Sequence, residues 1–277
     1  MSFKNKEKIL TAISAGLTFL GFLFILPSAY AEENLQSALK EVAEKVGAIE
    51  DIKNDSYLNN QERKVAELLA RKDALLKIFD LTLLEDKDLN KKLLEIKNLD
   101  ENQKKIRDGL INSLKENENA YSEMKNRIEE TDSVTEVKQL AIDFKNWRNL
   151  VYNPKVEKII SFNLVFQSKN IIAVAQNRAN KIREELKKIN SEDLIWIESL
   201  LEKAELKIKK AENLNITAEN LIIQEITKGE NLSFFKKFFY KNQIPAIKSL
   251  IEESTRNLKD AYLIFIEIGR AAKESSK

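Results

Sequence analysis

The sequence contains no cysteine and no histidine among its 277 residues. Without cysteine the chain has no disulfide, no thiolate metal site and no thiol nucleophile, so its folded state depends on packing alone. Without histidine it lacks the most common general base and the most common transition-metal ligand. These absences remove much of the chemistry that enzymes use, and we expect a non-enzymatic protein that binds no cofactor and no metal.

Glycine and proline are also scarce, with six and three residues respectively. The glycines form no phosphate-binding loop, and strand-like alternation of apolar and polar residues is absent. Charged residues make up 32% of the chain, and Lys, Glu, Leu, Ile and Asn are abundant, which is typical of helices joined by few tight turns. The composition therefore predicts an all-α fold, in which long antiparallel helices form an elongated helical bundle with coiled-coil segments.

Carboxylates are abundant and would be the basis of any enzymatic function. Adjacent acidic residues occur at Glu129-Glu130, Glu184-Glu185 and Glu252-Glu253. Neighbouring residues on a helix point about 100° apart, whereas hydrolysis by two carboxylates needs the two acids across a cleft. We interpret these pairs as solvated helix surface.

Only one long hydrophobic run occurs, over residues 9–26. It follows three lysines in the first eight residues and precedes Ala29 and Ala31, small residues at the spacing of a signal-peptidase site. We therefore predict that residues 1–31 are a cleaved signal peptide and that the protein is exported, to the periplasm, the cell surface or the exterior. The alternative is an uncleaved membrane anchor formed by residues 9–26, since this run nearly suffices to span a bilayer.

The chain has no marked excess of one charge. It carries 46 Lys and Arg against 44 Asp and Glu, and residues 1–31 hold three of the lysines and one of the glutamates. The chain after residue 31 is therefore formally neutral. A nucleic-acid-binding protein normally shows a basic excess, so we expect no nucleic-acid partner.

Two apolar stripes with helical spacing follow the signal segment. The first steps by 4, 3, 4 and 3 positions over residues 33–53, the spacing of a coiled-coil seam formed by Leu35, Leu39, Val42, Val46 and Ile49. The second covers residues 65–83, after a polar break, and ends at a predicted turn at Glu85-Asp86. We predict that the two stripes form a helical hairpin.

Residues 87–130 have the thinnest apolar stripe of the chain, interrupted by charged and Asn-rich intervals. A thin stripe buries little apolar area and needs a partner helix to hold it. We therefore expect an extended, mobile arm here, which could self-associate. On this interpretation residues 32–132 form one domain, a coiled-coil or helical-hairpin arm, and residues 133–277 form a C-terminal helical bundle.

The start of the C-terminal bundle is marked by capping and proline signals. Ser133 and Glu136 have the spacing of a capping box, in which each side chain accepts a hydrogen bond from a free backbone N–H. Asn153-Pro154 predicts a sharp elbow, because the residue before proline avoids the helical conformation. We expect Trp147 to pack near this elbow, and a ligand-stacking role is its alternative.

A helix of about 35 residues is predicted over residues 154–189. Its first half, Ile171 and Val174 included, is apolar on more than one face, which predicts burial among several neighbours. Its second half narrows to one stripe. Asn190-Ser191 is expected to begin a return helix, and Pro245 a last one, so the sequence predicts a three-helix C-terminal unit.

The densest aromatic stretch of the chain also carries three lysines. One interpretation is a contact with a membrane surface or a partner, with the rings at the headgroup level and the lysines facing anionic lipid. The other is a short amphipathic connector whose rings close the end of a bundle. The residues concerned are Phe234, Phe235, Lys236, Lys237, Phe238, Phe239, Tyr240 and Lys241.

These features predict an exported, non-enzymatic helical protein of the bacterial cell envelope or exterior, acting as a structural spacer or a protein-interaction scaffold. A protein partner, or a second copy of the chain, would bind through its helices. The alternative function is a membrane-associated adaptor, held by an uncleaved N-terminal helix or by residues 233–241. Long Lys/Glu helices occur in many unrelated proteins, so the composition identifies no partner.

Overall fold

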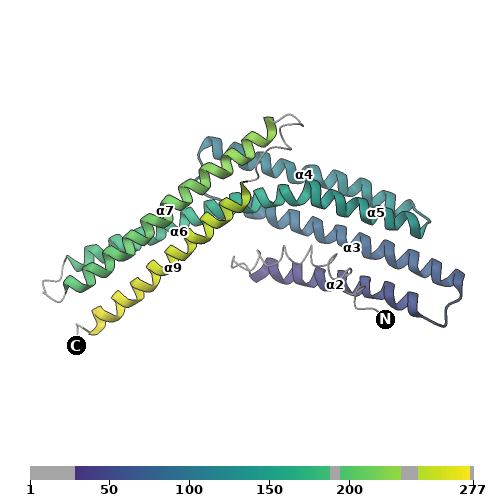
Figure 1. The fold of residues 1–277 in the computed structure, drawn as a ribbon, viewed down its shortest axis with the longest axis horizontal. Helices are drawn as coiled ribbons and strands as arrows, with labels where there is room; N and C mark the ends of the chain where they lie inside the picture. The colour runs from purple at the N-terminus through teal and green to yellow at the C-terminus, as the bar shows by residue number, and fades with distance from the viewer. Residues whose placement is uncertain (1–28, 188–193, 232–242, 275–277) are drawn as a thin grey trace. The chain divides into compact units, whose positions relative to one another are not determined.

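The computed structural model describes residues 29–187, 194–231 and 243–274. Every regular element in these ranges is a helix, and none of the described residues forms a strand, so the predicted all-α fold is confirmed. Long helices pack against one another as bundles (Figure 1). None of the described helices is long and apolar enough to cross a membrane.

The chain divides into two compact units, Met1–Glu85 and Asp86–Lys277. The division falls inside helix α3, Asn60–Leu94. Residues 86–132 therefore belong to the same compact unit as the C-terminal helices. The domains predicted from the sequence, 32–132 and 133–277, have a different boundary and stay a prediction.

The described part of the first unit is a helical hairpin, as predicted. It consists of α2, Ala29–Asn54, and the N-terminal part of α3. Two ion pairs join the helices, Lys45 Nζ to Asp73 Oδ2 and Lys77 Nζ to Glu41 Oε1, each at 2.8 Å. From one pair to the next the residue number falls by four on α2 and rises by four on α3, so the helices are antiparallel. The hydrogen bond from Lys77 to Glu41 also raises the pKa of the lysine.

Side chains of the turn between α2 and α3 fix the start of α3. Asn59 is the N-cap, and its Oδ1 accepts from two backbone N–H groups at 2.9 and 3.0 Å. The Glu62 carboxylate accepts in return from the Asn59 N–H at 3.0 Å, which completes a capping box. Arg63 donates to the carbonyls of Asp55 and Leu58 at 2.8 and 3.0 Å. The polar break in the sequence is thus an ordered turn.

The turn predicted at Glu85-Asp86 is wrong, because α3 continues without interruption to Leu94. Two of the buried residues in this part of the helix, Thr82 and Asp86, are polar. They interrupt the apolar pattern of the sequence, although the line of buried residues continues along the helix. Thr82 is satisfied within the helix, since its hydroxyl donates to the Ile78 carbonyl at 2.8 Å. The buried residues step by 4, 3 and 4 positions and are Thr82, Asp86, Leu89 and Leu93.

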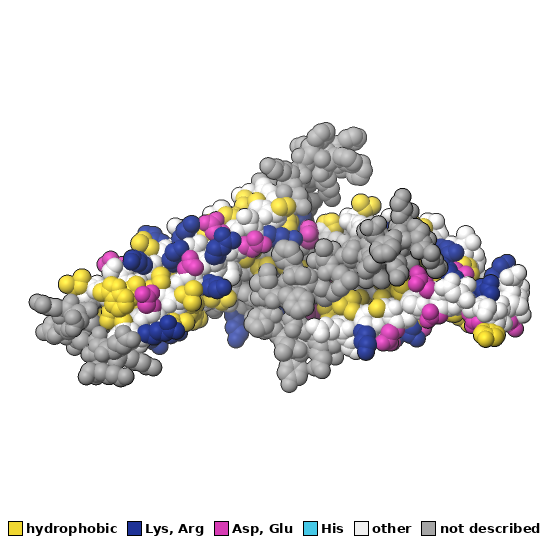
Figure 2. Space-filling model, turned by 60° about the horizontal axis from the view of Figure 1, so that its bottom comes forward, with side chains coloured by type: hydrophobic (Ala, Val, Ile, Leu, Met, Phe, Trp, Pro, Cys, Tyr) yellow, Lys and Arg dark blue, Asp and Glu magenta, His cyan; other side chains and the backbone are white. Residues whose placement is uncertain are grey.

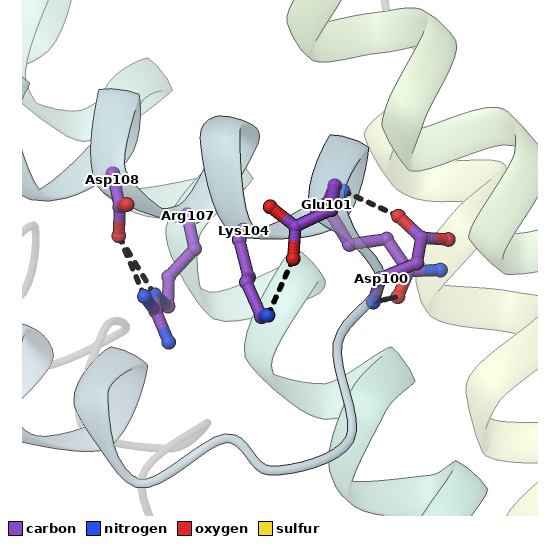
Figure 3. A network of polar contacts seen from close by, with 6 residues as sticks. Asp100, Glu101, Lys104, Arg107 and Asp108 are labelled. Carbon is purple, nitrogen blue, oxygen red and sulfur yellow. Dashed lines mark hydrogen bonds and ion pairs between the residues drawn. The ribbon is translucent and has the colours of Figure 1, made fainter.

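The mobile arm predicted for residues 87–130 is also wrong, because most of it is helix α4, Glu101–Glu130, within the second compact unit. Asp100 and Gln103 form a capping box at its start, where the Gln103 N–H donates to Asp100 at 2.8 Å (Figure 3). Asn98, with φ of 59°, turns the chain before this cap, a conformation that Asn tolerates. The thin stripe is buried along the helix at Gln103, Ile106, Leu110, Ile111, Leu114, Asn117, Tyr121 and Ile128.

The helix break predicted at Asn153-Pro154 does not occur, because Asn153 itself is helical, with φ of −57° and ψ of −44°. Helix α5, Val134–Trp147, leads through the π-helical turn η1, Arg148–Tyr152, directly into α6, Asn153–Leu186. Proline has no N–H, and its ring crowds the carbonyl four residues back, so a regular helix would be strained here. In the wider π turn the Asn153 N–H donates to the carbonyl five residues back, which carries the helix past the proline.

The start of α5 follows the prediction in part. Ser133 is the N-cap, since its hydroxyl accepts from the Glu136 N–H at 3.4 Å. The Glu136 carboxylate accepts instead from the hydroxyl of Thr131. Trp147 packs at the end of α5, with its ring centroid 5.8 Å from Phe144 and 5.4 Å from Tyr121 of α4. These aromatic contacts hold α4 and α5 side by side.

The three-helix unit predicted from the sequence is present and consists of α6, α7 (Leu194–Asn231) and α9 (Ile244–Glu274). Ion pairs join α7 to both neighbours, Arg183 of α6 to Glu205 and Lys207 to Asp260 of α9. Small buried residues let α7 and α9 approach closely, and the Ser254 hydroxyl of α9 donates to the Ala211 carbonyl of α7 at 2.9 Å. The small residues are Ala204, Ala211, Ser254 and Ala261. The predicted start of α7 at Asn190-Ser191 lies outside the described residues.

The two halves of α6 differ in burial, as predicted. The first half is enclosed on several sides, because α4 joins α7 and α9 against it, and Lys155 of α6 donates to Asn117 of α4 at 2.9 Å. Ile171 and Val174 do not belong to this enclosed part and are exposed. The fully enclosed residues are Val156, Ile159, Phe162 and Val165, and the buried stripe of the second half is Ile172, Ala175, Ala179 and Leu186.

The stability loss caused by a polar substitution should differ between the enclosed side and the exposed side of α6. Val165→Asn places an amide where no solvent reaches, and we expect the free energy of unfolding of the second unit to fall by about 3 kcal/mol. Val174→Asn is the matched control on the same helix, because Val174 is 58% exposed. Its expected change is within about 0.5 kcal/mol. Urea titration followed by circular dichroism measures both, and equal losses would contradict the burial pattern.

Candidate functional site

A polar cluster joins α3, α4 and α6 inside the second unit. Asp86 of α3 and Asn117 of α4 are 3% and 2% exposed, and the Asn117 amide donates to Asp86 Oδ2 at 3.4 Å. Lys155 of α6 donates to the Asn117 side-chain oxygen at 2.9 Å and to the Ser113 carbonyl at 2.8 Å. Asn117 therefore bridges a buried acid and a partly buried amine.

Burial shifts the pKa of Lys155. The pKa of its amine is lowered, chiefly because burial penalises the ammonium form, while the negative charges of Glu116 and Asp86 oppose this shift. An amine of lowered pKa can act as a base or nucleophile where a substrate reaches it. Here the amine donates to a backbone carbonyl and an amide of α4, and this geometry fits the alignment of α6 with α4 better than a reaction with an outside substrate.

A second buried carboxylate fixes the start of α9. Glu225 of α7 is 3% exposed and accepts a hydrogen bond from the Gln243 N–H at 3.4 Å. The Lys158 ammonium of α6 lies 3.7 Å from the same carboxylate. A carboxylate at a helix N-terminus satisfies a free N–H and complements the helix dipole. Glu225 thus ties the beginning of α9 to α6 and α7.

The outward surfaces of α6 and α9 carry exposed apolar side chains next to cations. Two stripes step by three and four positions, so each follows one side of its helix. All eight residues of these stripes are exposed. They are Ile171, Val174, Arg178 and Lys181 on α6, and Lys259, Leu263, Ile266 and Arg270 on α9. We call these eight residues the α6/α9 face.

The two stripes of the α6/α9 face lie beside each other. The guanidinium of Arg178 on α6 lies 5.9 Å from the ring centre of Tyr262 and 5.7 Å from that of Phe265, both on α9. These contacts hold the cation over the junction of the two helices. Figure 2 shows hydrophobic side chains among charged side chains of both signs on the C-terminal bundle, at the left of the view. The α6/α9 face is therefore a mixed apolar and charged surface.

A third exposed stripe lies on α7. Ile195, Ser199, Glu202 and Leu206 step by 4, 3 and 4 positions, and Glu198 stands beside them. Ile195 and Leu206 are 73% and 67% exposed, so this stripe also presents large apolar side chains. We call these five residues the α7 face. Its charged members are acidic, and the exposed lysines Lys203, Lys209 and Lys210 flank the stripe.

Several residues predicted from the sequence cannot be placed on these surfaces. Residues 233–241, which hold the predicted aromatic and lysine contact, lie outside the described residues, as does most of the predicted signal segment. Ala29 and Ala31 fall at the beginning of α2. Both assignments stay predictions. Within the described ranges, no group of three or more acidic side chains could hold a metal ion.

The exposed faces were not predicted from the sequence. Helical periodicity alone assigns Ile171 and Val174 to the buried part of their helix, and the structure corrects this assignment. The sequence does contain a signal for the α9 stripe. Lys259 lies four residues before Leu263, and Arg270 lies four residues after Ile266. Charged residues in line with apolar ones indicate a surface stripe, whereas core stripes continue with apolar residues.

Removing the bridging amide tests the polar cluster. Asn117→Leu leaves Asp86 and Lys155 without the side chain between them, and we expect the free energy of unfolding to fall by about 2–4 kcal/mol. Ser113→Ala is the control, because Lys155 binds the Ser113 carbonyl, and the Ser113 hydroxyl donates to the Leu110 carbonyl. Its expected change is within about 0.5 kcal/mol. A tolerated Asn117→Leu change would show that the cluster does not hold these helices together.

The lowered pKa of Lys155 predicts a pH dependence of stability. The folded state binds this proton less tightly than the unfolded state, so the protonated lysine opposes folding. The resulting loss of folding stability is present below the folded-state pKa and disappears as the pH rises towards 10.5, the ordinary pKa of lysine. We therefore expect the wild type to gain stability relative to Lys155→Met over this rise in pH. Urea titrations of both proteins measure the difference, and a decrease would contradict the shift.

Comparison with protein-family models, curated proteins and solved structures finds no match for this chain. No residue role is therefore carried over from a relative. The described residues thus offer two features on which a function can depend, a buried polar cluster that aligns helices and exposed faces that carry apolar side chains.

Proposed function

We propose that this chain is an exported, non-enzymatic helical protein of the bacterial cell envelope or exterior that binds other proteins through its helix surfaces. The α6/α9 face is the observation that carries the proposal. Large apolar side chains are exposed there on two adjacent helices, and Val174 and Leu263 are 58% and 55% exposed. A contiguous apolar surface rimmed by polar residues marks an interaction site, whereas a single exposed apolar residue does not.

The length of the helices supports a role as a spacer or scaffold. α6, α7 and α9 contain 34, 38 and 31 residues. A helix rises about 1.5 Å per residue, so each of these spans roughly 50 Å. Glu225 and the polar cluster at Asn117 fix how the helices align. A bundle of this kind presents its outward residues at set positions along its length.

The export part of the proposal is supported by residues 1–31 of the sequence. A membrane-associated adaptor, held by residues 9–26 or by residues 233–241, is the alternative. Flotation with anionic vesicles separates the two, comparing wild type with a variant in which Phe234, Phe235, Phe238 and Phe239 are changed to Ser. Loss of flotation in the variant would favour the adaptor, and wild-type protein that stays unbound would favour the exported scaffold.

Site-specific photo-cross-linking tests the α6/α9 face in the producing cell. A photoreactive amino acid at Val174 is expected to form protein adducts in the envelope or culture fluid. The matched control is the same amino acid at Lys125, an exposed residue of α4 outside the face. Adducts at both positions would indicate non-specific contact, and a cytosolic location in the accompanying fractionation would overturn the export part of the proposal.

A further inference from the structure

The side chains of Lys155 and Asn117 place an amine against an amide. The Lys155 amine of α6 donates to the Asn117 side-chain oxygen of α4 at 2.9 Å. A C=O bond is about 1.2 Å long, so the amine nitrogen lies no more than about 4 Å from the amide carbon, Cγ. Atoms poised to react are about 3–3.5 Å apart, and a small rotation of the lysine side chain is enough to bring these two together.

The surroundings hold this pair in place and keep water away from the amide. The Lys155 amine also donates to the Ser113 carbonyl at 2.8 Å, which fixes it against α4. Asn117 is 2% exposed, and Leu114 and Tyr121, about one turn before and after it on α4, are buried as well. Water, which would compete with the amine for the amide carbon, is therefore excluded from Asn117.

Burial and a neighbouring acid supply the two remaining conditions for a reaction. Only the neutral form of an amine has the free electron pair that attacks a carbonyl carbon, and the lowered pKa of Lys155, caused chiefly by burial, increases this form. Asp86 of α3 is 3% exposed, and its carboxylate accepts from the Asn117 amide nitrogen at 3.4 Å. The acid therefore stands beside the nitrogen that would leave, where it can carry a proton.

We propose that Lys155 and Asn117 join in an amide cross-link between α6 and α4, formed by the folded chain itself. The neutral amine attacks Cγ of Asn117, and the N–C bond forms as an electron pair of the C=O bond moves to the oxygen. Asp86 takes a proton from the attacking nitrogen and passes it to the asparagine amide nitrogen. The C=O bond then re-forms, the original C–N bond breaks, and ammonia leaves. The reaction consumes no oxidant, reductant or other co-reactant.

The cross-link would act in this chain as disulfides act in many exported proteins. The sequence has no cysteine, and a bond between residues 117 and 155 closes a covalent ring that contains α5 and the π turn η1. A cross-link of this kind restricts the unfolded chain and so stabilises the fold. The bond goes beyond the proposed function and does not depend on it, because it concerns the buried polar cluster and not the α6/α9 face.

Mass spectrometry of the purified full chain tests the proposal. We expect the mass of the denatured wild type to be lower than the mass of its sequence by one molecule of ammonia. Tryptic digestion should give residues 116–125 joined to residues 149–158, because trypsin does not cut after a lysine whose amine has become an amide. Fragmentation of the joined peptides should place the bond at Asn117 and not at Asn119.

Two variants and an internal control separate the cross-link from simple contact. Lys155→Arg keeps the cation but removes the nucleophile, because a guanidinium stays protonated, and we expect full mass. Asp86→Asn keeps the side-chain shape without the proton carrier, and we expect joining to slow about a hundredfold or more. Mass spectra at intervals after cell-free synthesis measure this rate, and circular dichroism checks that each variant is folded. The internal control is Lys210 with Glu253, an exposed pair at 2.8 Å whose peptides should stay separate.

A wild type of full mass, with the two peptides separate, would overturn the proposal. Loss of ammonia without the joined peptide would also overturn it, because an asparagine that cyclises on its own backbone loses the same mass. Joining of Asp86→Asn at the wild-type rate would remove the role of Asp86. The pH dependence predicted for Lys155 belongs to the chain with a free amine, since an amide nitrogen does not titrate near pH 10.5. Its absence from wild type of reduced mass would support the bond.

Discussion

Burial of α6 is the interaction on which the second unit depends. The chain has no cysteine, so apolar contact between helices has to hold the fold together without disulfides. α7 and α9 pack along α6, and α4 closes the remaining side of its first half, where Val156 and Val165 have no exposed surface. The second half lacks this fourth helix among the described residues, and its outward side carries Ile171 and Val174. The packing that forms the core therefore also leaves the surface that we assign to binding.

Polar residues within the seams decide how the helices align. Leucine and isoleucine seams tolerate a shift of one helix along another, because apolar contacts are non-directional. Hydrogen bonds and charges are directional, and moving them out of register leaves a polar group buried without its partner. Asn117 between Asp86 and Lys155, Glu225 at the start of α9, and Ser254 against the Ala211 carbonyl each act in this way. The same positions interrupt the apolar pattern of the sequence, which is why they are difficult to interpret before the structure is known.

The two exposed faces follow from the same architecture. A three-helix bundle has an outward side on each helix, and here these sides carry exposed apolar residues next to charged residues of both signs.

The all-α class, the hairpin at α2 and α3, the Ser133 cap and the unequal burial of the two halves of α6 can all be predicted from the amino-acid sequence. Each of these depends on spacing within one helix or on a local hydrogen bond, which the order of residues already specifies. Three properties depend on how the helices pack: α3 continues past Glu85, a π turn precedes Pro154, and α4 buries the apolar stripe of residues 101–130. The outward position of Ile171 and Val174 is a fourth such property. These properties depend on which neighbours reach a given side of a helix, and a residue's own position in the sequence does not carry that information.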